Sequence, residues 1–90
     1  MILFRGATRI EELQDGKLAI VALNVPQLAI ADPRQGVITD VIPLDEPAQW
    51  VWADPEGPFI FVGHFTATAG VVVELIDSAS LKPAGIVEFD

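Results

Sequence analysis

The sequence predicts an all-β protein made of two similar units of four antiparallel strands. Three observations support this fold class. The apolar residues gather in eight short runs rich in Val, Ile, Phe or Trp, which are residue types that favour strands. Proline and glycine, seven of each, mostly fall between these runs, as they do in turns. The pattern of the first half of this 90-residue chain also returns in the second half.

The eight predicted strands are short, and turn signals such as Asp-Gly, Asp-Pro, Glu-Gly and Lys-Pro separate them. In chain order they cover residues 9–13, 18–23, 28–31, 37–44, 49–53, 59–63, 71–76 and 85–89. The first run also fits a helix, because Ile10 and Leu13 have helical spacing. A strand is favoured there, since the matching stretch QWVWADPEG alternates aromatic residues and contains Pro55.

An internal repeat relates the two halves of the chain. Placing Ala7 on Ala48 matches KLAIVAL with PFIFVGH at a constant offset of 41 residues. Extra residues near TATA shift the offset to 45, and LAIAD then matches VELID. The sequence thus predicts a single domain, residues 1–90, with repeats at 5–47 and 48–90. A period of about 40 to 50 residues with four strands per unit is typical of a β-propeller blade.

Each unit resembles a YVTN-type β-propeller repeat, a WD-like architecture. The stretches EPAQWVWADPEGPFIFVGH and VVVELIDSAS carry the resemblance best, and QDGKLAIVALN and LAIADPRQG form a weaker copy. The tetrapeptide that names the family is replaced by IVAL and FVGH. The resemblance implies blades of four antiparallel strands with the innermost strand first. It implies no catalytic residue, because such propellers serve as binding platforms, redox-protein subunits and surface proteins alike.

Two blades would leave a flanking face open on each side, whereas closed propellers have about four to eight blades. Stacked repeats bury their faces only against their neighbours. We therefore expect further blades from identical chains, from another protein or from a longer chain of which these residues are a piece. Three or four copies would give a ring of about six or eight blades. Residues 1–4, MILF, have the pattern of the tail of a preceding outer strand, with Leu3 in the place of Leu44.

The composition narrows the classes of partner. Thirteen acidic and five basic residues give a net charge of -8, which disfavours nucleic acid and anionic membrane surfaces, because both bind mainly through Lys and Arg. The chain has no cysteine for disulfides or thiolate metal sites, and its acids lack the spacing of a calcium loop. We expect no metal and no cofactor. No signal peptide or spanning segment is visible, so the compartment stays open, with the cytoplasm favoured.

Three residues are candidates for ligand binding: Trp50, Trp52 and His64. The two tryptophans alternate on one side of a predicted strand, where they could stack on a sugar or a base. Packing between blades is the favoured interpretation of this pair. His64, the single histidine, ends a predicted strand and could bind a ligand or act as a base. A residue at the edge of a loop is the favoured interpretation of His64.

The remaining polar and glycine signals are interpreted as structural. Acidic residues at turns accept hydrogen bonds from nearby backbone N–H groups, and those placed at turns are Asp15, Asp32, Glu56 and Asp77. The glycines interpreted as turn or bulge residues are Gly57, Gly63 and Gly70.

The sequence favours a non-enzymatic scaffold or binding module that acts through assembly with other blades, as a homo-oligomer or with a protein partner. No catalytic residue is assigned. One alternative is a subunit of a multi-chain enzyme or redox complex, with a site shared between chains. Another is a monomeric small β-barrel or sandwich that binds an apolar ligand.

Overall fold

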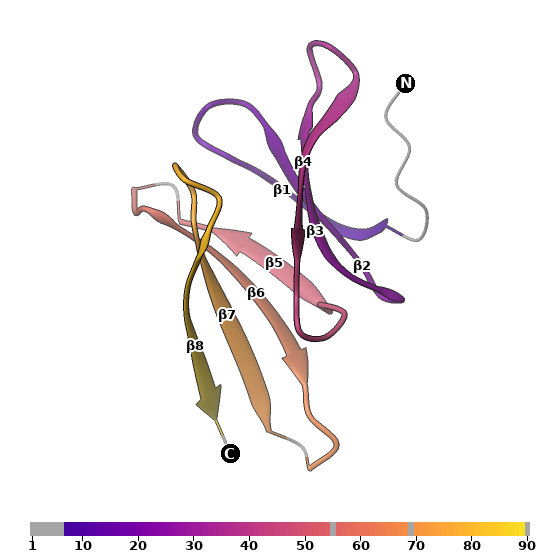
Figure 1. The fold of residues 1–90 in the computed structure, drawn as a ribbon, viewed down its shortest axis with the longest axis vertical. Coiled ribbons are helices and arrows are strands. Elements are labelled where there is room, and N and C mark those ends of the chain that lie inside the picture. The colour runs from indigo at the N-terminus through magenta and orange to yellow at the C-terminus, as the bar shows by residue number, and fades with distance from the viewer. Residues whose placement is uncertain (1–6, 55, 69, 90) are drawn as a thin grey trace.

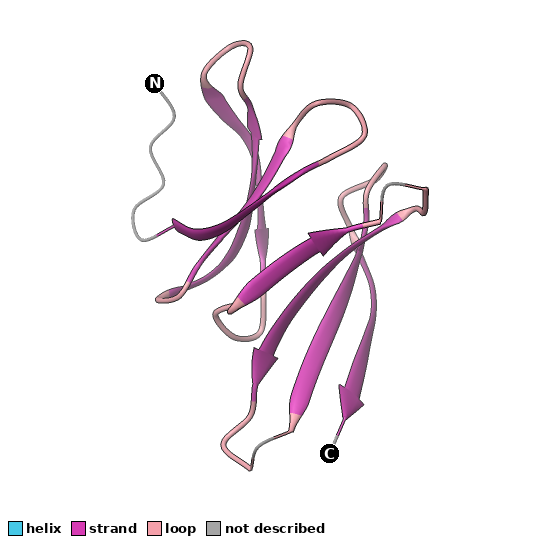
Figure 2. Cartoon of the chain, turned by 180° about the vertical axis from the view of Figure 1, so that it is seen from behind, coloured by secondary structure: helices cyan, strands magenta, loops and turns pink. Residues whose placement is uncertain are grey.

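A computed structural model describes residues 7–54, 56–68 and 70–89, which form strands and loops only (Figures 1 and 2). The first four strands are β1 (Ala7–Glu12), β2 (Leu18–Ala22), β3 (Val25–Asp32) and β4 (Val37–Pro43). The last four are β5 (Trp50–Ala53), β6 (Phe59–Phe65), β7 (Val71–Asp77) and β8 (Pro83–Phe89). Each predicted run corresponds to one of these strands, so the all-β prediction is confirmed. The expected outer-strand tail at residues 1–4 lies outside the described residues.

The strands form two antiparallel sheets in which neighbours in the chain are neighbours in space. The first sheet has the order β1-β2-β3-β4 and the second the order β5-β6-β7-β8, so they do not close into one barrel. The first sheet lies in the upper part of Figure 1 and the second in the lower part. Strand β5 contacts β1 and β2, where the two sheets meet. None of the described residues belongs to a helix that could cross a membrane.

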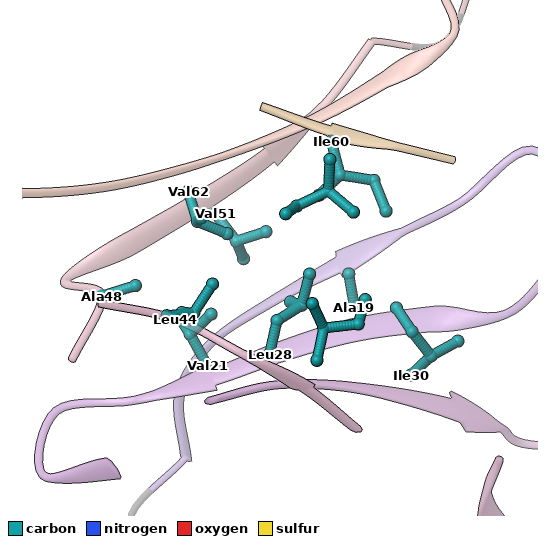
Figure 3. Close-up of a cluster of buried hydrophobic side chains, with 11 residues drawn as sticks. Ala19, Val21, Leu28, Ile30, Leu44, Ala48, Val51, Ile60 and Val62 are labelled. Atoms are coloured by element: carbon teal, nitrogen blue, oxygen red, sulfur yellow. The ribbon is translucent and has the colours of Figure 1, made fainter. Parts of the chain in front are cut away.

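A buried apolar cluster joins one side of the first sheet to one side of the second, and we call it the intersheet cluster (Figure 3). Its members are Ala19, Val21, Leu28, Ile30 and Ile42 from the first sheet, Val51, Ile60, Val62 and Ile76 from the second, and Leu44 and Ala48 between them. Alternation along each strand supplies these side chains, because every second residue points to the same side. Burying each Val, Leu or Ile stabilises the fold by roughly 1.5 to 3 kcal/mol, which holds the sheets together.

The pairing of the strands shows how the two repeats correspond. In the first sheet, Ile10, Ile20, Ala29 and Val41 are paired across the four strands. In the second sheet, Val51, Val62, Glu74 and Ile86 are paired in the same way. Offsets of 41 for the first strand and 45 for the third and fourth therefore agree with the structure. The predicted offset of 41 for the second strand is wrong, because Ile20 corresponds to Val62 and not to Phe61.

The physical reason for this shift is the first hairpin of each sheet. Glu12 pairs with Leu18, whereas Ala53 pairs with Ile60, so the hairpin between β5 and β6 is one residue longer. A slip of one residue moves every side chain of a strand to the opposite side of the sheet. The corrected correspondence therefore decides which surfaces of the two sheets are equivalent.

Aspartates organise the tight turns. The carboxylates of Asp15, Asp32 and Asp77 accept hydrogen bonds from backbone N–H groups two residues further on, at 2.9 to 3.0 Å, as predicted. The prediction for Glu56 is wrong, since the acceptor in that turn is Asp54, and Glu56 donates its backbone N–H to it at 3.0 Å. Hydrogen bonds from the backbone N–H groups of Ser80 and Ala79 hold the pKa of Asp77 below its ordinary value of 3.8.

Candidate interaction surface

The side of the second sheet that points away from the first sheet carries every Phe and Trp side chain among the described residues. Val51, Ile60, Val62 and Ile76 point into the intersheet cluster, so the residues that alternate with them point to the opposite side. We call this opposite side the aromatic face. Its apolar members are Trp50, Trp52, Phe59, Phe61, Phe65, Val71, Val73, Leu75, Val87 and Phe89.

Much of the aromatic face is open to solvent. Trp52 is 49% exposed, Phe65 61% and Phe89 56%. The rings of Trp52 and Phe61 lie 5.2 Å apart at 32°, and Phe59 meets Phe61 edge-on at 6.3 Å. A contiguous exposed apolar surface on a small domain indicates a place where another molecule binds.

The indole ring of Trp50 lies close to the backbone of the sheet because the residue paired with Trp50 is a glycine. Trp50 pairs with Gly63, and a Cβ atom at Gly63 would overlap the indole ring. Gly63 is buried inside β6, so its prediction as a turn or bulge glycine is wrong: its role is to let the indole lie against the backbone. Gln49 fixes this end of β5, since its N–H donates to Gly63 O at 2.7 Å and its Oε1 accepts from Phe65 N at 3.1 Å.

The structure brings two of the three predicted ligand-binding residues to one surface. Trp50 and Trp52 share the aromatic face, as their alternation predicts. His64 lies on the opposite side of the second sheet, where it pairs with Val72. The neighbouring Phe59, Phe61, Phe65 and Phe89 were not singled out from the sequence. The alternation in Phe59-Ile60-Phe61 was the available signal, but without the pairing it does not show which side faces the core.

Near His64 the surface is acidic. Burial raises the pKa of Glu74 above its ordinary value of 4.5, and the charge of Asp45 raises it further. A hydrogen bond from the backbone of Asp45 and the proximity of His64 both lower it in part. Among the described residues, no group of three or more His, Asp or Glu side chains is arranged to hold a metal ion.

Two hollows lie where the sheets meet. One, of about 210 Å³, is lined by the β1–β2 hairpin and by turns of the second sheet, including Asp15 and Asp54, whose carboxylates already accept turn hydrogen bonds. The other, of about 390 Å³, is lined by Arg9, Leu23, Gln49, Trp50 and Phe65 and adjoins the aromatic face. The larger of these two hollows thus adjoins the aromatic face.

The corrected register links the aromatic face to the intersheet cluster. Ala19, Val21, Leu28 and Ile30 correspond in the second sheet to Phe61, Gly63, Val73 and Leu75. The four residues of the first sheet are buried against the second sheet. Their counterparts lie on the aromatic face, which no part of the described chain covers with another sheet. Equivalent sides of the two sheets therefore differ: the side of the first sheet is covered by the second sheet, and the equivalent side of the second sheet is open.

Comparisons with known proteins concern the fold. No protein family model and no curated protein matches the chain. Among solved structures, a chain of the Kuenenia stuttgartiensis hydrazine synthase superposes with a TM-score of 0.78 and 12% sequence identity. The match covers 89% of this chain and 23% of the hydrazine synthase chain. At this identity the likeness is one of fold alone.

Proposed function

We propose that the chain is a non-catalytic assembly module, a pair of β-propeller-type blades that acts by docking its aromatic face on a further β-sheet. The observation that carries this proposal is the equivalence of the two sheets. The side of the first repeat that corresponds to the aromatic face already serves as a sheet-packing surface within the chain. The resemblance of both units to YVTN-type repeats agrees with this role.

The size of the exposed aromatic side chains supports docking over a solvent-facing role. Fully burying one large apolar side chain contributes roughly 1.5 to 3 kcal/mol. About half or more of the surface of Trp52, Phe65 and Phe89 is exposed, so covering these side chains would release a large part of this free energy. Aromatic side chains are also enriched at the centres of protein interfaces.

The test combines molar mass with access to the tryptophans. Light scattering over a concentration series should give a discrete multiple of the mass of the chain, and acrylamide should quench the tryptophan fluorescence weakly. Val87→Glu places a charge on the aromatic face and should weaken association by about tenfold or more, because burying an unpaired charge is unfavourable. Ile86→Glu is the matched control, since Ile86 is similarly exposed on the same strand but points to the opposite side.

A chain that does not assemble is examined with an apolar fluorescent dye. If the wild-type chain is a folded monomer that binds the dye, and Val87→Glu does not bind it, the aromatic face is an open docking surface. A folded monomer at every concentration that neither binds the dye nor shields its tryptophans would contradict the proposal.

A further inference from the structure

The proposed function leaves the occupant of the aromatic face to be identified. Resting on that function, we infer that the occupant is a second copy of this chain, docked by the outward side of its first sheet. We call that side the aliphatic face. Its apolar members are Ile10, Leu18, Ile20, Ala29, Ala31, Ile38 and Val41.

The interface within the chain provides the geometry. It joins the side of the first sheet that carries Leu28 and Ile30 to the side of the second sheet that carries Ile60 and Ile76. Their counterparts are, respectively, Val73 and Leu75 on the aromatic face and Leu18 and Ala31 on the aliphatic face. Repeating the same packing step therefore brings the aromatic face of one copy against the aliphatic face of the next.

The charge distribution also suits contact between identical chains. The aliphatic face is exposed at its margins, with Ile10 58% and Val41 49% exposed, and Leu18 and Ile38 pack against its buried centre. Among the paired residues that lie on the two faces, the charged ones are Glu12 on the aliphatic face and Asp77 on the aromatic face. Two chains of net charge -8 can therefore meet here without apposing many carboxylates.

Contact between two different faces has a consequence for assembly. A docked pair still presents one free aromatic face and one free aliphatic face, so association continues until the ring closes or a fibre grows. Three or four copies would supply about six or eight blades, within the usual range of closed propellers.

The test uses two variants that each retain one face. Trp52→Glu disables the aromatic face, and Ile10→Glu disables the aliphatic face. Neither residue is a member of the intersheet cluster, and cooperative unfolding of each variant checks its fold. Each variant alone should be a monomer by light scattering, whereas an equimolar mixture should form a dimer of twice the chain mass. If Trp52→Glu fails to fold, Val87→Glu replaces it on the same face.

Three outcomes overturn the inference, and two of them leave the proposed function intact. Dimerisation of Ile10→Glu alone means that aromatic faces pair with each other. A wild-type chain that is a dye-binding folded monomer at all concentrations still has its docking surface, for a partner other than itself. A wild-type chain that assembles while the equimolar mixture stays monomeric excludes the aromatic-to-aliphatic contact.

Discussion

The two sheets have the same strand order and corresponding registers, but the equivalent sides have different neighbours. Ala19 and Leu28 of the first sheet are buried against the second sheet. Their counterparts Phe61 and Val73 lie on the partly exposed aromatic face. The pairing of the backbones is therefore not what distinguishes an internal surface from an external one. The internal side of the first sheet and the aromatic face of the second sheet differ in their side chains and in whether another sheet lies opposite those side chains.

The second sheet partly covers its own open side. Where the first sheet pairs Arg9 with Val21, the second pairs Trp50 with Gly63. The indole lies against the glycine backbone, which protects that part of the strand without another sheet. An aromatic side chain over a strand glycine thus replaces some of the contact that the first sheet obtains from its neighbour.

Truncating equivalent residues of the two sheets should give the largest difference in stability between the covered side and the open side. Ile30→Ala should lower the free energy of unfolding by about 2 to 5 kcal/mol, because it opens a cavity in the intersheet cluster. Leu75→Ala, at the equivalent position on the aromatic face, should cost about 1 kcal/mol in dilute solution, because less of its surface is buried. Denaturant unfolding at low protein concentration measures both losses.

The two losses should also depend differently on protein concentration. If the aromatic face is covered on assembly, the loss from Leu75→Ala should grow with concentration, while the loss from Ile30→Ala changes less. Equal losses from the two variants in a dilute monomer would show that the sides are equally covered, contrary to the comparison.

A second prediction concerns Gly63. Gly63→Ala should destabilise the fold by about 1 to 3 kcal/mol, because the added methyl group overlaps the ring of Trp50. Gly85→Ala is the matched control, since a Cβ atom there meets nothing within 4 Å, and it should change stability by less than about 0.5 kcal/mol. Thermal or denaturant unfolding measures both variants.

The cause can be isolated in a Trp50→Ala background. There, the additional loss from Gly63→Ala should shrink, because the overlapping ring is gone. An undiminished loss would assign the effect to the backbone of β6 and not to the indole.

These results show what the sequence could and could not predict. The strands and three turn aspartates follow from local patterns, because β-branched and aromatic runs and Asx turns are set by nearby residues. The tryptophan pair could be placed on one side from alternation alone. The sequence could not show whether that side faces the core or points outward. The answer depends on a difference of one residue in length between the β1–β2 and β5–β6 hairpins, and neither repeat reveals this difference by itself.

The turns between the last two strands of each sheet illustrate the same limit. Gly36 and Leu81 occupy equivalent positions, and both have positive φ angles, of 70° and 59°. A glycine there is an expected signal, whereas a leucine in this conformation costs about 1 to 2 kcal/mol and is not expected. Leu81 packs against the intersheet cluster, which offsets that cost. A tertiary contact decides the backbone conformation here, and it is invisible to a reading of local sequence.

The smallest predicted effect concerns Glu74, which replaces the Ala29 of the first sheet. Burial raises the pKa of Glu74 above 4.5, so the folded chain binds this proton more tightly than the unfolded chain. Stability from this group is therefore present below pH 4.5 and is lost as the pH rises through the folded pKa. Glu74→Gln should raise the free energy of unfolding at pH 7 by less than about 1 kcal/mol, since solvent screens a partly buried side chain.

The pH dependence separates this effect from a general change in packing. Glutamine resembles the protonated carboxyl group, so the advantage of Glu74→Gln should vanish below pH 4.5, as measured by unfolding from pH 3.5 to 7. Glu88→Gln, on the exposed neighbouring strand, is measured in parallel as a control for the removal of one carboxylate. An advantage of Glu74→Gln that persists at low pH would mean that side-chain contacts, and not the charge, set the difference between this position and Ala29.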